Sequence, residues 1–376
     1  MPSLRPEIDP DGLLEYSVVY TDRSLNHMSK RFQQGMRDIS ATLKEVYGAR
    51  SAIVVPGSGS YGMEAVARQF VQGQKVSIVR NGWFSYRWSQ ILETGRMTSE
   101  IEVYKARRTS DDPQSPFAPA PIDQVVAGIR RQRPGVVFAP HVETASGMLL
   151  PDDYLRNLAD AVHAGGGLFV LDCVASGAAW VDMRALGVDV LISAPQKGWS
   201  ASPCAGLVML GDAARERIDS TSSDSFSCDL KKWLTIMETY ESGAHAYHAT
   251  LPTDALMVLR DAMEEMRGFG FENGRKAQFE LGNKVRALLA DRGIASVAAP
   301  GFEAPGVVVS HTSRDDWHRG AAFAARGLQI AAGVPLACDE GPDYKSFRLG
   351  LFGLDKLKDV DAAVGRLRQA LEGMPT

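Results

Sequence analysis

Lys197 lies in an unusual setting, the stretch SAPQKGWSASPCAG at residues 193–206. The apolar run VDVLISAP precedes it and small residues surround it, whereas most lysines are solvated surface charges. A lysine removed from water has a lowered pKa, which leaves its amine free to condense with a carbonyl carbon. We therefore treat Lys197 as a candidate nucleophile.

Asp172 ends the apolar run LFVLD and precedes Lys197 by 25 residues. A carboxylate in such a run needs a charged or hydrogen-bonded partner, because burying it alone is costly. One suitable partner is the protonated ring nitrogen of pyridoxal phosphate, whose ring then acts as an electron sink. A metal-ligand role or a helix-cap role is the alternative.

The stretch PGSGSYG, residues 56–62, lies between an expected strand and an expected helix. Its glycines allow close approach of an anion, and the helix N-terminus and the hydroxyls of Ser58 and Ser60 offer donors to a phosphate. A capped turn is the alternative. No GK[ST] follows, which excludes a Walker loop. The stretch has the outline of a dinucleotide motif, but the next expected strand, KVSIVRNG, lacks an acidic end.

Arg348 lies in the run SFRLGLFG, flanked by apolar residues. An arginine in such a run needs an anionic partner, and its planar fork fits the α-carboxylate of an amino acid. A structural ion pair is the alternative.

The elements that would position these residues alternate along the chain. Seven apolar runs are expected strands: 51–56, 75–82, 101–106, 135–141, 167–174, 188–195 and 206–211. Amphipathic helices between them predict a mostly parallel α/β sheet covered on both faces. A long helix is expected near 253–284. It would join a large domain, 31–255, to a smaller C-terminal domain, 256–376.

The bulk composition of the 376 residues is that of an ordinary globular protein, with 45% hydrophobic residues and a net charge of −4. The sequence has no cluster of basic residues, so it does not predict a nucleic-acid partner. No apolar run approaches the roughly 20 residues that span a membrane. The four cysteines show no CxxC spacing, so we expect reduced thiols, a cytoplasmic location and no metal site.

In order and spacing, these residues resemble fold-type I pyridoxal phosphate enzymes, specifically class V aminotransferases of the alanine–glyoxylate and serine–pyruvate type. The resemblance runs from about residue 27 to 370. It rests on VVPGSGSYGMEA, RNGWFSYRW, PHVETASGMLLP, LFVLDCVASGAAW, GVDVLISAPQKGWSASPCAGLVML, YHATLP and FRLGLFG. It implies an α/β fold with a seven-stranded, mostly parallel sheet, and a small α+β C-terminal domain.

The resemblance also implies roles for individual residues. Lys197 would be the Schiff-base lysine and the acid–base group, and Asp172 would pair the pyridine nitrogen. Arg348 would bind the substrate carboxylate. The remaining cofactor-binding positions would be Ser58, Gly59, Ser60, Phe84, Val174, Gln196, Tyr247 and Thr250. The last two would reach the phosphate from the second subunit of a homodimer.

Some positions allow other readings or depart from the family pattern. Trp83 is the alternative to Phe84 for stacking on the cofactor ring. His27 falls in the N-terminal segment, residues 1–30, which lines the substrate pocket in the family. Ala145 stands where a hydroxyl residue commonly contacts the phenolic oxygen of the cofactor, so Ser146 or a water would have to replace it.

The function implied is transamination, in which a small amino acid such as alanine or serine donates its amino group to a 2-oxo acid such as glyoxylate or pyruvate. The first alternative is a lyase of the cysteine desulfurase type, with Cys338 as its reactive thiol. Such lyases typically carry His-Lys where this chain has Gln196-Lys197. The second alternative is a cofactor-binding regulator without turnover, for which no DNA-binding module is found.

Overall fold

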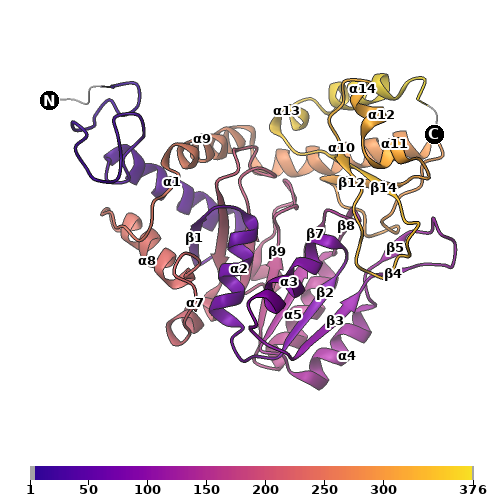
Figure 1. The fold of residues 1–376 in the computed structure, drawn as a ribbon, viewed down its shortest axis with the longest axis horizontal. Helices are drawn as coiled ribbons and strands as arrows, with labels where there is room; N and C mark the ends of the chain where they lie inside the picture. The colour runs from indigo at the N-terminus through magenta and orange to yellow at the C-terminus, as the bar shows by residue number, and fades with distance from the viewer. Residues whose placement is uncertain (1–4, 375–376) are drawn as a thin grey trace.

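The computed structural model describes residues 5–374, and Figure 1 shows their arrangement. A seven-stranded sheet has the strand order β1–β11–β10–β9–β6–β2–β3. Its strands are β1 Ser51–Pro56, β2 Val76–Arg80, β3 Ile101–Lys105, β6 Val136–Pro140, β9 Leu168–Asp172, β10 Val190–Ser193 and β11 Ala205–Leu210. Each strand falls on one of the seven apolar runs of the sequence, which confirms the expected sheet.

The direction of the strands determines where the site can lie. Strands β10, β9, β6, β2 and β3 form a run of five mutually parallel strands, whereas β11 is antiparallel to both β1 and β10. The loops that follow the five parallel strands therefore emerge at one edge of the sheet. Ligands of open α/β sheets bind beyond such carboxyl ends.

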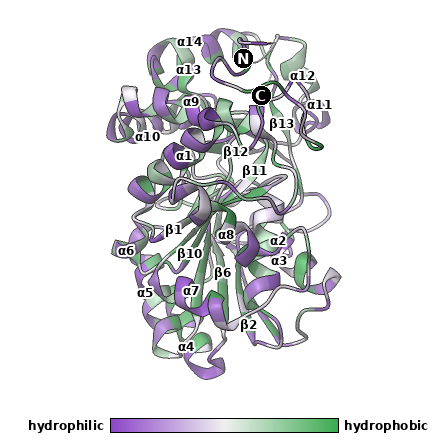
Figure 2. Cartoon of the chain, turned by 90° about the vertical axis from the view of Figure 1, so that its left-hand side faces the viewer, coloured by the Kyte–Doolittle hydropathy of each residue, from purple (hydrophilic) through white to green (hydrophobic). Residues whose placement is uncertain are grey.

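Helices pack on the sheet and give it a two-sided apolar environment. Those of the first two thirds of the chain are α1 Lys30–Tyr47, α2 Gly59–Phe70, α3 Trp83–Thr94, α4 Ile122–Gln132, α5 Asp152–Ala164, α6 Met183–Leu186, α7 Asp212–Arg217 and α8 Leu230–Glu241. Helix α2 packs on β11, α3 on β2, α5 on β9 and α8 on β1. Figure 2 shows the hydrophobic strands enclosed by helices that are hydrophilic on their outer sides.

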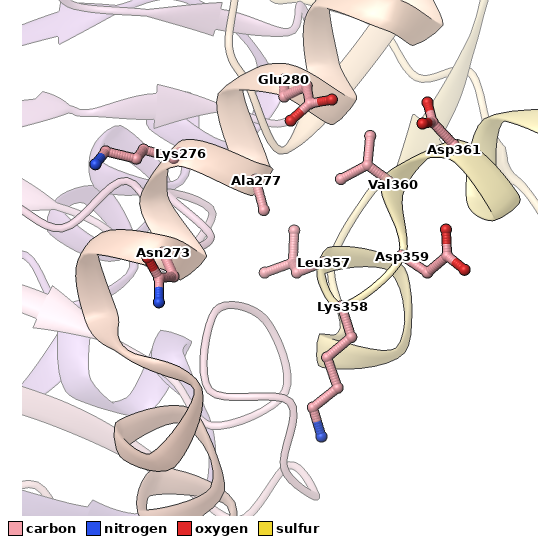
Figure 3. A pocket seen from close by; sticks show the side chains of 9 residues that line it. All are labelled: Asn273, Lys276, Ala277, Glu280, Leu357, Lys358, Asp359, Val360 and Asp361. Carbon is pink, nitrogen blue, oxygen red and sulfur yellow. The ribbon is translucent and has the colours of Figure 1, made fainter.

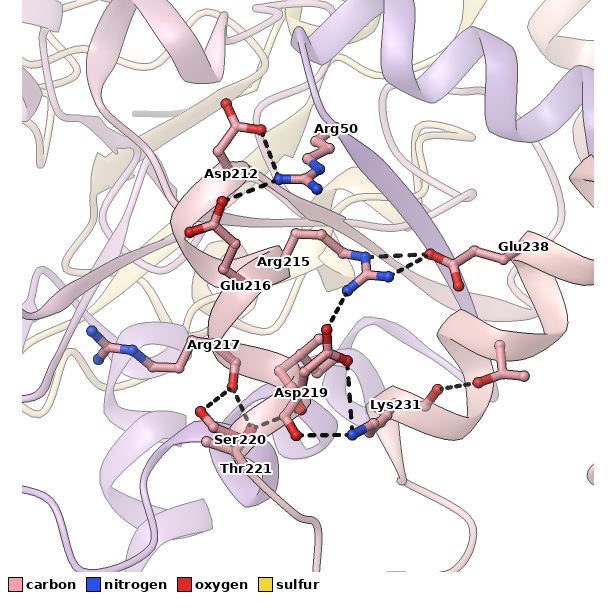
Figure 4. A network of polar contacts seen from close by, with 12 residues as sticks. Arg50, Asp212, Arg215, Glu216, Arg217, Asp219, Ser220, Thr221, Lys231 and Glu238 are labelled. Atoms are coloured by element: carbon pink, nitrogen blue, oxygen red, sulfur yellow. Dashed lines mark hydrogen bonds and ion pairs between the residues drawn. The ribbon is translucent and has the colours of Figure 1, made fainter.

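Short elements decorate this framework. They are the pairs β4 Arg107–Arg108 with β5 Phe117–Ala118 and β7 Val142–Glu143 with β8 Met148–Leu149, and a 3-10 helix, η1 Ile218–Ser220. Figure 4 shows the polar contacts that tie η1 to its neighbours. Arg215 pairs with Asp219 at 3.1 Å and with Glu238 of α8 at 3.0 Å. Such exposed pairs contribute little stability, so they mainly orient α7 against α8.

The expected long helix is two helices, α9 Thr253–Phe269 and α10 Phe271–Ala290. They are separated at Gly270, whose φ of +94° and ψ of +123° lie outside the helical region. Only glycine adopts such a positive φ at little cost, so this single residue ends α9 and redirects the chain. The helical periodicity continues through Gly270 in the sequence, which is why one helix was expected.

The C-terminal part has its own small sheet and its own core. Strands β12 Val307–His311, β14 Ser346–Gly350 and β13 Ala331–Ala332 pair in that order, all antiparallel. Its short helices are α11 Asp315–His318, α12 Ala321–Ala324, α13 Leu354–Leu357 and α14 Val360–Leu371. Helix α10 packs against α14 and α13, as Figure 1 shows at the upper right. Within residues 5–374, no helix has the length and apolar character needed to cross a bilayer.

Candidate active site

The parallel register brings the candidate residues to one edge of the sheet. Asp172, the last residue of β9, lies opposite Ile192 of β10 on one side and Pro140 of β6 on the other. Lys197 follows β10 in a tight turn. Both residues thus lie at the carboxyl edge of the sheet, because neighbouring parallel strands end there together.

Asp172 is a buried carboxyl group without an ion-pair partner in the described part of the chain. It is 7% exposed, and its Oδ1 accepts a hydrogen bond of 2.9 Å from the backbone N–H of Val174. The pKa of Asp172 is raised to about 6, mainly because the carboxyl is buried; the Val174 bond lowers it, and the nearby Glu143 carboxylate raises it. A cationic ring nitrogen at this place would stabilise the buried carboxylate.

Lys197 is half-buried, and its surroundings disfavour its ammonium form. Burial lowers the pKa of the Lys197 amine, and the positive charge of Arg348 lowers it as well. Its Nζ lies 5.0 Å from the centroid of the Phe352 ring. A cavity of about 600 Å³ opens beside it, lined among others by Gln196, Lys197, Ser200, Glu265, Phe352 and Lys358. The amine is therefore both accessible and predisposed to lose its proton.

The turn at 57–60 forms a cradle at the start of α2. Ser58 occupies the N-cap position of α2, yet its side chain makes no capping hydrogen bond, so its hydroxyl is free for another acceptor. A Cβ on Gly59 would lie 2.9 Å from Cγ2 of Val174, so this glycine lets α2 approach the loop after β9. The hydroxyl of Ser60 accepts a bond of 2.8 Å from Arg87. A phosphate would find hydroxyl, backbone N–H and guanidinium donors here.

Phe84 is presented by the first turn of α3. The buried carboxylate of Glu143 accepts bonds from the backbone N–H of Phe84 at 3.2 Å and of Ser85 at 2.8 Å, and from the Ser85 hydroxyl at 2.6 Å. These bonds satisfy donors that a helix N-terminus leaves free, and they hold the aromatic ring in place. Trp83, the alternative, packs instead against Tyr86 at a ring-centroid distance of 5.5 Å.

Arg348 lies on β14 and approaches the same ring from the C-terminal part. Its Nε donates a bond of 2.8 Å to the carbonyl of Ala332, and its Cζ lies 5.5 Å from the centroid of Phe84. Burial lowers its pKa, although an arginine stays charged at neutral pH. The described residues give it no salt bridge, so its guanidinium remains open to an anionic ligand.

Polar atoms left over in this region fit pyridoxal phosphate. Gln196 Oε1 and the hydroxyl of Ser146 are buried and have no hydrogen-bond partner among the described residues. Ala145 is fully buried and offers no hydroxyl. Unpaired buried polar atoms are uncommon and call for a missing partner. Together with the cradle, the Asp172 carboxyl and the Lys197 amine, they match the phosphate, the ring nitrogen and the aldehyde of that cofactor.

Three of the predicted site residues, His27, Tyr247 and Thr250, lie together in another part of the molecule. Tyr247 is 53% exposed, and its hydroxyl bonds to Thr250 at 3.1 Å. The ring of His27 lies 5.6 Å from that of Tyr247 and 5.9 Å from that of His245. This group precedes α9, whereas Glu265, near the other end of α9, lines the Lys197 cavity. The 12 residues from Thr253 to Glu265 span about 18 Å of helix, which separates the start of α9 from the part of it that lines the Lys197 cavity.

Sequence reasoning missed two residues that the structure places at the site. Glu143 positions the start of α3, and Arg87 joins Ser60 while its Cζ lies 5.2 Å from the Phe84 ring centroid. Arg87 follows Phe84 by three residues, and this spacing places both on one face of a helix. Glu143 follows a strand end, which is the only signal the sequence carried for it.

A second pocket lies outside this region. Figure 3 shows it between α10 and the segment after α13, lined by Asn273, Lys276, Ala277, Glu280, Leu357, Lys358, Asp359, Val360 and Asp361. It is mostly polar, and none of the candidate residues lines it. Two candidate residues, Gln196 and Lys197, line the Lys197 cavity instead.

Comparison with known proteins gives an independent line of information. A family model described as aminotransferase class-V matches residues 13–338. Alanine–glyoxylate aminotransferase of Callithrix jacchus is 28% identical over 363 residues, which cover 93% of this chain and 83% of that protein. 2-Aminoethylphosphonate–pyruvate transaminase 2 of Paraburkholderia xenovorans (strain LB400) is 29% identical over 340 residues, which cover 88% and 85%.

Solved structures share the fold. An aspartate aminotransferase of subgroup IV from Thermus thermophilus superposes with a TM-score of 0.75 at 23% identity and covers 93% of each chain. Alanine–glyoxylate aminotransferase from Nostoc sp. has a TM-score of 0.75 at 21% identity and covers 92% of this chain and 89% of its own. Cysteine desulfurase from Thermococcus onnurineus NA1 is more distant, with a TM-score of 0.66 and 13% identity. These likenesses confirm the expected fold.

Proposed function

Because the chain belongs to the aminotransferase class-V family, we propose that it transfers the amino group of a small amino acid such as alanine or serine to glyoxylate or pyruvate. The observation that supports this most directly is the meeting of Lys197, Asp172, Phe84 and Arg348 at one edge of the sheet. Each has the chemistry that the reaction needs at that place.

The residues would divide the binding of the cofactor among themselves. Ser58, the N-terminal N–H groups of α2, Ser60, Arg87 and Gln196 would hold the phosphate. Phe84 and Val174 would enclose the ring, and Asp172 would hold its nitrogen in the protonated form. When bound, pyridoxal phosphate supplies an aldehyde for covalent attachment of amines and a ring that accepts electrons from the substrate Cα.

Lys197 would carry out both the attachment and the proton movement. Its lowered pKa makes the neutral amine available to bond to the aldehyde carbon of the cofactor. When not bonded to the cofactor, the amine of Lys197 would remove the proton from the substrate Cα and hold it during the transfer. Arg348 would hold the substrate carboxylate during this transfer.

The finer points of this proposal concern assembly and location. A homodimer would allow Tyr247 and Thr250 of one subunit to reach the phosphate of the other, as the family resemblance implies. Their exposure leaves them free for this contact. The four cysteines are free thiols, which supports a cytoplasmic location.

The lyase alternative receives no support from Cys338. This thiol is buried, its Sγ donates to the carbonyl of Arg80 at 3.4 Å, and burial raises its pKa to about 12. A persulfide-forming cysteine needs an accessible thiolate, which this environment prevents.

Lys197→Ala tests the proposal. We expect turnover of alanine or serine with glyoxylate or pyruvate to fall by at least about a thousandfold, because both attachment and proton transfer are lost. Borohydride treatment of the wild-type holoenzyme should fix the cofactor on the peptide that contains Lys197. The matched control is Lys358→Ala, which removes another lysine of the same cavity, paired with Glu265 at 2.6 Å. Full turnover in Lys197→Ala would overturn the proposal.

The donor panel should also include 2-aminoethylphosphonate, because one relative carries that donor in its name. Preference for alanine or serine supports the proposal. Exclusive use of 2-aminoethylphosphonate would agree with transamination but would contradict alanine or serine as the amino donor.

A further inference from the structure

The loop that joins β13 to β14, the strand that carries Arg348, is attached to the main sheet. Arg348 on β14 is held by the carbonyl of Ala332 on β13 at 2.8 Å. Between these strands the chain leaves the small sheet, and residues 336–340 contact the ends of β2 and β3. We propose that this 336–340 loop sets the position of Arg348, and that Glu340 is the positioning residue that folds it. The proposal rests on the proposed function, in which Arg348 binds the substrate carboxylate.

Glu340 shapes the loop from within. Its Oε1 accepts bonds from the backbone N–H of Leu336 at 2.6 Å and of Ala337 at 3.2 Å, and its Oε2 accepts one from Cys338 at 2.9 Å. Ala337 and Asp339 have φ of +59° and +61°, values that non-glycine residues rarely adopt. Three charge-assisted bonds to one carboxylate offset the cost of these conformations.

Three contacts then fix the folded loop on the main sheet, and a fourth joins it to β4. Arg80 donates to the carbonyl of Ala337 at 3.3 Å, and the Cys338 thiol donates to the carbonyl of Arg80 at 3.4 Å. Lys105 pairs with Asp339 at 2.7 Å. Arg108 donates to the carbonyl of Glu340 at 2.7 Å. The small sheet that carries Arg348 is therefore tied to β2 and β3, the strands that α3 and its Phe84 connect.

Arg80 shows that this attachment is not a chance surface contact. It is 8% exposed, and its polar partners are the Ala337 carbonyl and the hydroxyl of Ser89, with the ring of Tyr86 at 4.6 Å. The described residues provide no carboxylate in an ion pair with it. A buried cation without a counter-ion is costly, so the bond that Arg80 donates to the loop carbonyl helps to offset that cost.

Glu340→Gln tests the role of the loop. Glutamine keeps the size of the side chain but replaces one acceptor oxygen by an N–H group that faces the N–H of Cys338. With the holoenzyme, alanine and glyoxylate, we expect KM for alanine to rise about tenfold while kcat changes less than about twofold, because the carboxylate site is displaced and the reacting groups are not. In the cofactor-free protein, the amides of Leu336, Ala337 and Cys338 should exchange hydrogen faster.

A double-mutant cycle separates positioning from general damage. If Glu340 acts through Arg348, Glu340→Gln adds nothing to the KM effect of Arg348→Gln. The matched control is Glu303→Gln, because Glu303 also accepts a bond from a loop N–H, that of Gly301 at 2.7 Å. We expect this control to leave KM unchanged.

The outcomes distinguish the two proposals. An unchanged KM in Glu340→Gln, or multiplied effects in the double variant, overturns the role of the loop. An unchanged KM in Arg348→Gln itself overturns the assignment of Arg348 in the proposed function.

Discussion

The guanidinium of Arg348 lies over the ring of Phe84, with Cζ 5.5 Å from the ring centroid. The two residues come from β14 in the C-terminal part and from the first turn of α3. The candidate group for the substrate carboxylate therefore adjoins the candidate ring that would stack on the cofactor. Arg87 approaches the same ring at 5.2 Å, but its bond to Ser60 directs it to the phosphate cradle.

Arg87→Gln should weaken cofactor binding without a direct effect on the substrate carboxylate. Loss of the guanidinium removes a charge-assisted donor beside the cradle, so we expect the Kd for pyridoxal phosphate to rise roughly tenfold. Titration of the cofactor-free protein, followed by the absorbance of the bound cofactor, measures this. Arg131→Gln, which removes an exposed arginine paired with Glu102 at 3.1 Å, serves as the control. An unchanged Kd in Arg87→Gln would remove Arg87 from the cradle.

Asp172→Asn should stabilise the cofactor-free protein at high pH. The pKa of this buried carboxyl is raised to about 6, so the folded chain holds the proton more tightly than the unfolded chain. Stability is therefore lost as pH rises from about 4 to about 6, and the loss persists above. Asparagine carries no charge and keeps an acceptor for the N–H of Val174. We expect a gain of about 1–3 kcal/mol in the free energy of unfolding at pH 8.

Urea unfolding of the cofactor-free variants at pH 5 and pH 8 measures this difference, which should be larger at pH 8. Asp111→Asn, at an exposed position, should show no such growth. The same Asp172→Asn variant should lose transaminase activity in the holoenzyme, because the ring nitrogen would lack its anionic partner. A variant that is less stable than wild type at both pH values would contradict the burial argument.

Hybrid dimers should show whether Tyr247 and Thr250 serve the other subunit. If the site is shared between subunits as proposed, Lys197→Ala and the double variant Tyr247→Phe/Thr250→Val each disable a different half of it. After the two are unfolded and refolded together, half of the dimers are hybrids with one intact site. Activity should then recover to about a quarter of wild type.

The control for this experiment mixes each variant with itself, and neither mixture should gain activity. If each active site were built from one chain, the mixed sample would stay as inactive as its parents. That result would place Tyr247 and Thr250 outside the catalytic assembly.

Local sequence determined the sheet and the chemistry of its edge. Runs such as LFVLD and VDVLISAP are apolar throughout because parallel strands are buried on both faces, and the structure places β9 and β10 there. The polar residues at the ends of such runs, Asp172 and Lys197, then lie at the same edge of the sheet because neighbouring parallel strands end there. The sequence also predicted the glycine-rich turn at Gly59, between a strand and a helix, which the structure shows as β1 and α2.

Tertiary structure decided what periodicity and spacing do not encode. The positive φ of Gly270 divides a segment whose hydrophobic pattern predicts one helix. The pattern of side chains does not show this break, because it lies in the backbone conformation of a single residue. The support of Phe84 by Glu143 and the contact of Phe84 with Arg348 join residues 59 and 264 positions apart. Such contacts depend on how whole elements pack, and packing is a property of the folded chain rather than of any one stretch of it.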